Sequence, residues 1–254
     1  MSSIREIQID FIKATGAPNA NLYFRMMISL NDLLNVKQLS SVIDKSGFDR
    51  QTVIGLDSYT NRLLQSHIAE ACATFVERIR PRAKQKTDPL YLAVQSDQVA
   101  LDCYKDLMKQ MFVLDANGEV TERIAPDGTK HTLLDQYEQL KSVRNQIGFH
   151  IDPEPFEKAI QTLKNEYAVN QPVKLIGVLM NNATKEMRFP IADTVVTAAS
   201  MQQSGIKDLT KVIDEHNVEY VAYRDYTKKL FELLLSYLAT TIRNWLYSEM
   251  LIVS

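Results

Sequence analysis

Three polar residues near the end of a predicted helix are the strongest candidates for chemistry in this sequence, namely Arg144, Asn145 and His150. The helical pattern before them begins near Thr132, and its apolar side chains fall on one broad arc. These apolar residues are Leu133, Leu134, Tyr137, Leu140, Val143 and Ile147. Arg144 lies about 40° from Leu140 around the helix, and therefore inside the arc. Because arginine is rarely buried without a partner, we expect either a cleft or interface at this face, or a paired guanidinium.

The position of His150 relative to Arg144 does not suit a single regular helix. The two residues lie about 120° apart around an unbroken helix and about 9 Å apart along it. Gly148 weakens the helix, and the run 152–155, Asp-Pro-Glu-Pro, ends it. We therefore expect His150 at a loosened helix end, where it can turn toward Arg144 or toward a second copy of the site.

The residues Arg144, Asn145 and His150 together resemble the signature of the HEPN superfamily, in which an arginine and a polar residue are followed, several positions later, by a histidine. The resemblance covers one helix of about twenty residues. It implies an all-α domain and a homodimer, because the matching family residues usually meet across a two-fold axis. It also implies a function in the range of that superfamily, which includes ribonuclease toxins, phage-defence nucleases and non-catalytic partners of nucleotidyltransferases. A protein partner of the antitoxin or nucleotidyltransferase kind is therefore expected.

For a catalytic member, the resemblance implies metal-independent cleavage of RNA, without a cofactor. The substrate's own 2′-hydroxyl, a group that DNA lacks, attacks the neighbouring phosphate. His150 would be the general acid or base, because the ordinary pKa of histidine suits proton transfer near neutral pH. Arg144 would hold the phosphate through its two-pronged guanidinium, and Asn145 would orient it by hydrogen bonding.

A non-catalytic interpretation of the same residues is also open. Arg144 could bond a carboxylate between two helices, and His150 could cap a helix C-terminus. The chain would then be a helical interaction or RNA-binding module, not an endoribonuclease.

A basic segment provides a second candidate site, for RNA binding. Its members are Arg78, Arg80, Arg82, Lys84 and Lys86, and Pro81 interrupts them. These cations could complement the negative end of a helix and remain solvated. They could instead contact phosphates, which a chain with a net charge of −2 can attract only through a local patch.

Composition restricts the class of protein. The chain has 254 residues, and its hydrophobic content of 45% and charged content of 24% are those of an ordinary globular domain. Cys72 and Cys103 are too few for a disulfide framework, and no Cys/His cluster has metal-ligand spacing, so we expect no metal site. Residues 1–6 lack the layout of a signal peptide, and no apolar run approaches membrane-spanning length. A cytoplasmic location without membrane contact is the expectation.

The predicted fold class is mainly α: a helical bundle with a small β-hairpin insertion, in one domain over residues 1–254. Only eight glycines and eight prolines occur, which favours helices over a turn-rich β fold. Helices are predicted at 3–14, from 19 or 21 to 43, from 57 or 58 to 80, at 93–113, at 132–147, at 156–167, at 192–203 and over the last forty residues. The β-hairpin insertion is predicted at 172–190, where a short buried helix is the alternative, and a loop or small hairpin is predicted at 115–128. The last helix is apolar around nearly its whole circumference, so we expect neighbours to enclose it.

Overall fold

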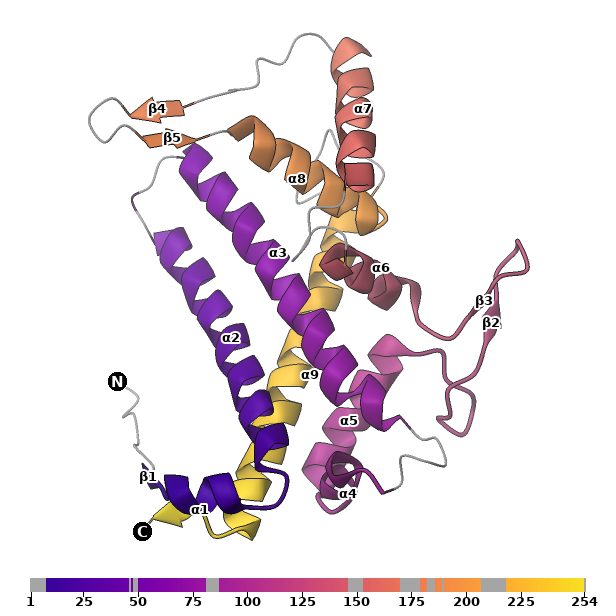
Figure 1. Ribbon diagram of the computed structural model, residues 1–254. Helices are drawn as coiled ribbons and strands as arrows, with labels where there is room; N and C mark the ends of the chain where they lie inside the picture. The colour runs from indigo at the N-terminus through magenta and orange to yellow at the C-terminus, as the bar shows by residue number, and fades with distance from the viewer. Residues whose placement is uncertain are drawn as a thin grey trace.

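The fold is mainly α, as predicted (Figure 1). The computed structural model describes residues 8–45, 47, 50–80, 87–145, 153–169, 179–181, 186–188, 190–206 and 218–253. The helices are α1 (Phe11–Gly16), α2 (Ala20–Lys45), α3 (Arg50–Phe75), the short 3-10 helix η1 (Glu77–Ile79), α4 (Pro89–Gln95), α5 (Gln98–Met111), α6 (Asp135–Val143), α7 (Pro153–Val169), α8 (Pro190–Gln203) and α9 (Val218–Ser248).

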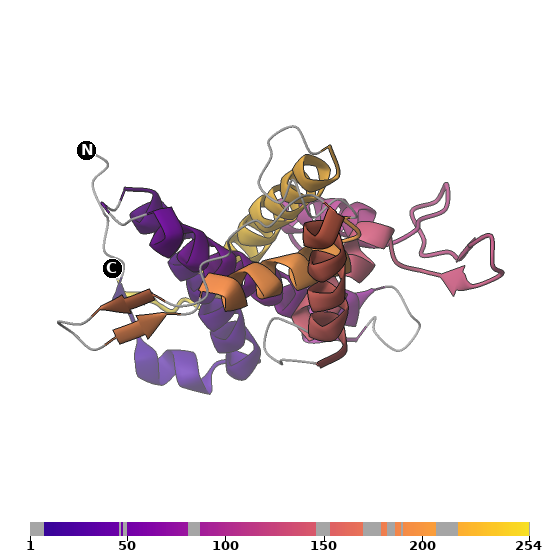
Figure 2. The same ribbon diagram turned by 90° about the horizontal axis from the view of Figure 1, so that it is seen from above.

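The strands within the described residues form three small antiparallel pairs. They are β1 (Gln8–Ile9) with β6 (Ile252–Val253), β2 (Arg123–Ile124) with β3 (Lys130–His131), and β4 (Leu179–Asn181) with β5 (Glu186–Arg188). The β4–β5 pair confirms the predicted hairpin within 172–190. The β2–β3 pair projects from the side of the bundle (Figure 2). The β1–β6 pair was not predicted, and Lys13 adds to it by donating from Nζ to the Met250 carbonyl at 2.9 Å.

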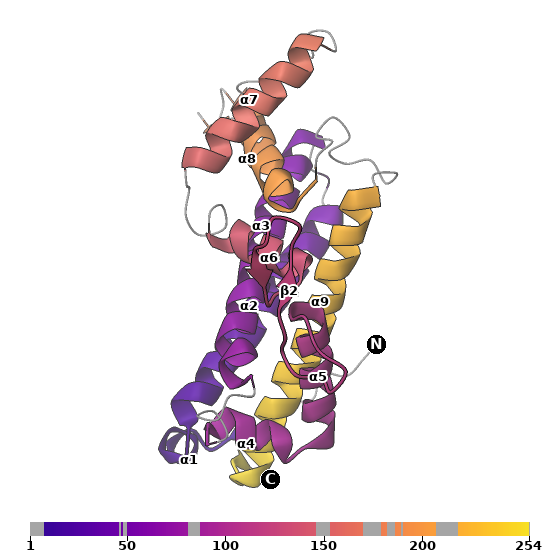
Figure 3. The ribbon, with the colours of Figure 1, turned by 90° about the vertical axis from the view of Figure 1, so that its right-hand side faces the viewer.

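The long helices α2, α3 and α9 run side by side, with α7 and α8 across one end (Figure 3). Neighbours cover only one face of α9, on which Leu230, Leu234, Tyr237 and Leu238 are fully buried. The opposite face is exposed and carries charged residues, so the predicted enclosure on nearly all sides is wrong. Near the other end of α9, the Trp245 ring stacks on a tyrosine of α2 with ring centroids 4.6 Å apart. The core therefore forms along the whole length of this helix.

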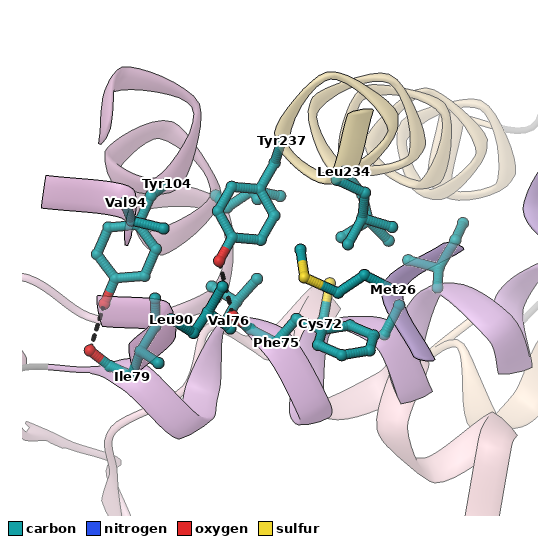
Figure 4. Close-up of a cluster of buried hydrophobic side chains, with 14 of the residues drawn as sticks. Met26, Cys72, Phe75, Val76, Ile79, Leu90, Val94, Tyr104, Leu234 and Tyr237 are labelled. Atoms are coloured by element: carbon teal, nitrogen blue, oxygen red, sulfur yellow. Dashed lines mark hydrogen bonds between the residues drawn. The ribbon is translucent and has the colours of Figure 1, made fainter. Parts of the chain in front are cut away.

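Buried tyrosines complete the hydrogen bonding where α3 gives way to η1 (Figure 4). The Tyr237 hydroxyl donates to the Phe75 carbonyl at 2.9 Å, and the Tyr104 hydroxyl donates to the Ile79 carbonyl at 3.2 Å. Carbonyls in the last turn of a helix lack partners within that helix, so these phenols supply donors at a buried helix end. Burial raises the pKa of both tyrosines above the ordinary value.

A second hydrophobic cluster joins α7 and α8, and α8 in turn packs against α3 and α6. Ser142 of α6 donates from Oγ to Oε1 of Gln203 at 2.7 Å. Gly205 ends α8 with a φ of +76°, and an added Cβ there would lie 2.5 Å from the Gln139 side chain. The positive φ favours glycine at this position, whereas the Gln139 amide is the far end of a flexible side chain that can move aside.

Two predicted helices have different boundaries in the structure. The second long helix begins at Arg50 and ends at Phe75, so the predicted start at 57 or 58 and the predicted continuation to Arg80 are wrong. The helix predicted at 93–113 is two helices, because Asp97 stops the first and caps the second by accepting from the Ala100 amide at 2.7 Å. At Asp97 a capping side chain outweighed the apolar periodicity.

Two helix starts were also placed wrongly. Within the predicted helix 3–14, Gln8 and Ile9 form β1, and α1 starts only after Asp10, whose side chain accepts from the Lys13 amide at 3.0 Å. The helix predicted at 156–167 begins at Pro153, because proline in a first helical turn loses no intrahelical hydrogen bond. Among the described helices, none is both long and apolar enough to cross a bilayer.

Candidate functional site at the end of α6

The start of α6 is held by the β2–β3 hairpin. Arg123 of β2 forms a bidentate ion pair with Asp135, in the first turn of α6. Nδ1 of His131, on β3, lies 3.1 Å from Oε1 of Glu138. Carboxylates in a first turn also interact favourably with the positive end of the helix dipole. The hairpin therefore fixes the position of α6 from its N-terminal side.

The inner face of α6 packs against α3, which sets the rotation of the helix. Tyr137, Leu140 and Val143 are fully buried, as expected for the arc on which the prediction of this helix was based. Ile147, the last member of that arc, lies outside the described residues. With these three side chains directed into the core, the next residue, Arg144, lies at the edge of the α3–α6 contact.

The Arg144 guanidinium is paired, which is one of the two alternatives expected for an arginine on this face. Arg144 keeps helical backbone angles, with φ −58° and ψ −46°. Its Nη2 forms an ion pair with Oε2 of Glu70 on α3, and its Nη1 donates to Oδ1 of Asn145 at 2.8 Å. Thr74, one turn after Glu70, donates from Oγ1 to the other carboxylate oxygen, Oε1, at 3.3 Å.

The pair is accessible to solvent. The side chain of Arg144 is 34% exposed and that of Glu70 is 43% exposed. The structure therefore brings together Arg144 and Asn145, two of the three residues predicted to be catalytic, and adds Glu70 and Thr74. His150, the third predicted catalytic residue, lies outside the described residues.

A second ion pair joins α6 to η1, the short helix that follows α3, nearer the start of α6. The Glu77 carboxylate accepts from the Tyr137 hydroxyl at 2.6 Å and from Lys141 Nζ at 3.0 and 3.2 Å. Burial raises the pKa of Tyr137 well above the ordinary value, and the neighbouring Cys72 and Glu77 add to this effect. We call the Glu70–Arg144 and Glu77–Lys141 pairs together the ion-pair ladder.

The thiol of Cys72 is buried close to the ladder but has no features of a nucleophile. Burial raises its pKa, and the charge of Glu77 raises it further, against a smaller opposite effect of Lys141. The thiolate needed for reactivity is therefore strongly disfavoured. Cys72 is a core residue.

The described members of the predicted RNA-binding segment contact other parts of the chain. Arg78 donates from Nε to Oδ2 of Asp88 at 2.9 Å, while Oδ1 of Asp88 caps α4. The Arg80 guanidinium carbon lies 5.9 Å from the centre of the Phe112 ring, in a cation–π contact. These contacts assign both arginines a structural role, and phosphate binding by them stays a prediction. Arg82, Lys84 and Lys86 lie outside the described residues.

Sequence reasoning missed the carboxylates that face α6. Glu70 and Glu77 are seven positions apart, close to two helical turns, and Arg144 and Lys141 are three apart. Each spacing puts two like charges on one helix face, and this periodicity is the signal that the sequence contained. The pairing itself depends on which helices become neighbours in the fold.

The described part of the chain contains no group of three or more His, Cys, Asp or Glu residues that could hold a metal ion. Comparisons with protein-family models, with curated proteins and with solved structures gave no match to this chain.

Proposed function

We propose that the chain is a metal-independent endoribonuclease of the HEPN type, which cleaves RNA through attack by the substrate's 2′-hydroxyl. The observation that supports this most directly is the state of Arg144. Its guanidinium bonds Glu70 and Asn145, and the side chain as a whole is still 34% exposed. A fixed cation that solvent can reach suits the negative charge that develops on a phosphate during cleavage.

The proposed reaction needs one proton taken from the 2′-hydroxyl and one given to the departing 5′-oxygen. The attack forms a bond from the 2′-oxygen to phosphorus and breaks the bond to the 5′-oxygen, leaving a 2′,3′-cyclic phosphate. His150 is the proposed group for proton transfer, because an imidazole titrates near neutral pH. Arg144 binds the phosphate oxygens, and Asn145 orients the guanidinium through its Oδ1.

A homodimer is part of this proposal. Arg144 and His150 diverge by about 120° on a continuous helix, so a second copy could supply the complementary residue to each site. A protein partner such as an antitoxin or a nucleotidyltransferase, and a role as a toxin or in phage defence, follow from the sequence resemblance alone. RNA contact by the basic segment from Arg78 to Lys86 belongs to the same proposal.

A second candidate function is a non-catalytic helical interaction or RNA-binding module. The contact that favours it is the Glu70–Arg144 ion pair, since an arginine that joins two helices has a structural reason to be present. In that case Arg144 braces α6 against α3, and the chain cleaves nothing.

The deciding experiment is cleavage of single-stranded RNA in EDTA by the wild type, by Arg144→Ala and by His150→Ala. The matched control is Arg243→Ala, which removes an exposed arginine that is likewise followed by asparagine but lies on α9. We expect the wild type and the control to cleave, and the two site variants to lose about 100-fold or more of the rate. Circular dichroism checks that each variant is folded.

Two results would overturn the ribonuclease proposal. One is a wild-type protein that leaves RNA intact, which supports the second candidate if Arg144→Ala also lowers the melting temperature. The other is cleavage that persists in Arg144→Ala or disappears with EDTA in the wild type. Salt-dependent RNA affinity that falls on neutralising Arg80, Arg82 and Lys84 would identify an RNA-binding module.

A further inference from the structure

The Arg144 guanidinium is held at both of its terminal nitrogens. Nη2 bonds the Glu70 carboxylate, and Nη1 bonds the Asn145 side-chain oxygen at 2.8 Å. Two anchors on different nitrogens, together with the covalent attachment at Nε, fix the plane of the group. Asn145 is itself exposed and adjacent in sequence, whereas Glu70 comes from another helix. Glu70 is therefore the contact that ties the guanidinium to the rest of the fold.

These two contacts leave donors over. A guanidinium has five N–H donors, and two of those of Arg144 bond Glu70 and Asn145. The other three, on Nε, Nη1 and Nη2, have no hydrogen-bond partner among the residues that the structure describes. An edge of the guanidinium that carries such remaining donors can bond phosphate oxygens, as arginine does in phosphate sites.

The Glu70 carboxylate is itself oriented, so that only one of its oxygens faces Arg144. Oε1 accepts from Thr74 Oγ1 at 3.3 Å, and Oε2 bonds Arg144. In the other pair of the ladder, both oxygens of Glu77 accept from Lys141, and one also accepts from Tyr137. Glu77 thus binds Lys141 through both carboxylate oxygens, whereas Glu70 binds Arg144 through one.

We propose that Glu70 is a positioning residue for the RNA phosphate site, which orients the Arg144 guanidinium so that its free edge faces the substrate. This inference rests on the proposed ribonuclease function and adds a residue to it. The carboxylate acts through Arg144 and does not touch the phosphate. The negative charge of Glu70 weakens RNA binding, whereas its contact with Arg144 increases the cleavage rate. Removing Glu70 should therefore raise the affinity for RNA and lower the cleavage rate.

The test compares Glu70→Ala with Glu70→Gln in the full chain, with kcat and KM measured on single-stranded RNA in EDTA. A glutamine keeps the oxygen acceptor for Arg144 and removes the charge. We expect Glu70→Ala to lower kcat about 10- to 100-fold, the effect of a misplaced binding group, without raising KM. We expect Glu70→Gln to keep kcat within about three-fold of wild type, because the glutamine oxygen still orients Arg144. If Glu70 acted only through its charge, Glu70→Gln would lose as much activity as Glu70→Ala.

Binding is measured separately with the same RNA carrying 2′-O-methyl groups, which cannot be cleaved by 2′-hydroxyl attack. Both Glu70 variants should bind it at least as tightly as the wild type, because a negative charge near the phosphate has been removed. Glu77→Gln is the matched control, since it removes a carboxylate of the same helix contact. It should change neither kcat nor this affinity by more than about two-fold.

The outcomes separate this inference from the proposed function. Wild-type cleavage that is lost in Arg144→Ala but fully kept in Glu70→Ala overturns the positioning role alone. Equal loss of kcat in Glu70→Ala and Glu70→Gln also overturns it, because the charge and not the orientation would then matter. A wild type that does not cleave RNA overturns both proposals. Melting temperatures of the variants show whether any loss comes from unfolding.

Discussion

The two pairs of the ion-pair ladder join α6 to α3 and to the adjacent η1 with the same chemistry, yet they differ in the number of hydrogen bonds that each carboxylate accepts. Glu77 and Lys141 are 21% and 31% exposed, and the carboxylate also takes the hydroxyl of the fully buried Tyr137. Glu70 is 43% exposed, and among the described residues its partners are one arginine and one threonine. The difference indicates that the Glu77–Lys141 pair holds α6 in the fold, whereas Glu70 orients the Arg144 guanidinium at the surface.

Known magnitudes support this division. A solvent-exposed ion pair contributes about 0–1 kcal/mol to stability. A buried phenol that donates to a carboxylate contributes about 1.5–3 kcal/mol, and leaving that phenol without a partner carries a similar penalty. Changes at Glu70 should therefore be visible in function before they are visible in stability, and changes at Glu77 in the reverse order.

The largest expected effect is unfolding at alkaline pH, because Tyr137 of the Glu77 pair is one of several buried tyrosines with raised pKa values. Burial raises the pKa of Tyr223, for example, from 10.0 to about 12. A raised pKa means that the folded state favours the neutral phenol. The neutral phenol contributes its full share to the free energy of unfolding below about pH 10, and this share is lost as the pH rises toward 12. For Tyr223 the loss is about 2–3 kcal/mol.

Absorbance of tyrosinate near 295 nm, recorded with circular dichroism, checks this prediction. Ionisation and loss of helix should occur together above about pH 10. After correction for its stability at neutral pH, Tyr137→Phe should begin to unfold at a higher pH than the wild type. Glu70→Ala should not change the pH at which unfolding begins. Phenols that ionise gradually near pH 10 in a chain that stays helical would contradict the assignment of these tyrosines to the core.

The next effect concerns stability at neutral pH. Glu77→Ala leaves the Tyr137 hydroxyl buried without its acceptor and Lys141 without its partner. We expect a loss of about 2–3 kcal/mol in the free energy of unfolding, measured by urea denaturation. Glu70→Ala is the matched variant, and it should lose less than about 1 kcal/mol. Equal losses for the two variants would remove the distinction between the pairs.

The smallest expected effect is the coupling within each pair, measured by double-mutant cycles. Replacing Glu77 and Lys141 singly and together should give a coupling of about 1 kcal/mol, and Glu70 with Arg144 about 0.5 kcal/mol. Lys109 and Asp106, whose side chains are 62% and 51% exposed, form the reference pair and should give still less. Coupling in the Glu70 pair should fall in 1 M salt, and a salt-independent value there would contradict its exposed character.

The sequence predicted the last helix correctly but not how far its neighbours cover it. Its apolar residues form the buried face of α9, whereas Lys228, Lys229 and Glu232 lie on an exposed face. The hairpin within 172–190 was predicted from an apolar run followed by turn residues, and β4 pairs with β5 as that pattern requires. By contrast, the start of α3 at Arg50 was missed because Asp57 and Ser58 are typical helix-capping residues and predicted a later start.

The candidate site was predictable in part for the same reason. An arginine within an apolar arc is anomalous, and this drew attention to Arg144. Its partner Glu70 lies 74 positions earlier in the chain, so the pairing depends on how α3 and α6 pack and not on any local pattern. The division into α4 and α5 at Asp97 was not predicted for another reason. A capping side chain cannot be told from any other polar residue in the sequence until its amide partner is known.

The pairing of β1 with β6 has a consequence for the order of folding. It brings together segments as far apart as Lys13 and Met250, which are 237 positions distant. Packing of Trp245 on α9 against a tyrosine of α2 already brings the two ends of the chain together, so a ladder of two residues adds little further stability. We expect this closure to come last in folding, and the amide of Asp10, which donates to the Leu251 carbonyl at 3.0 Å, to exchange with solvent deuterium before the helical core opens.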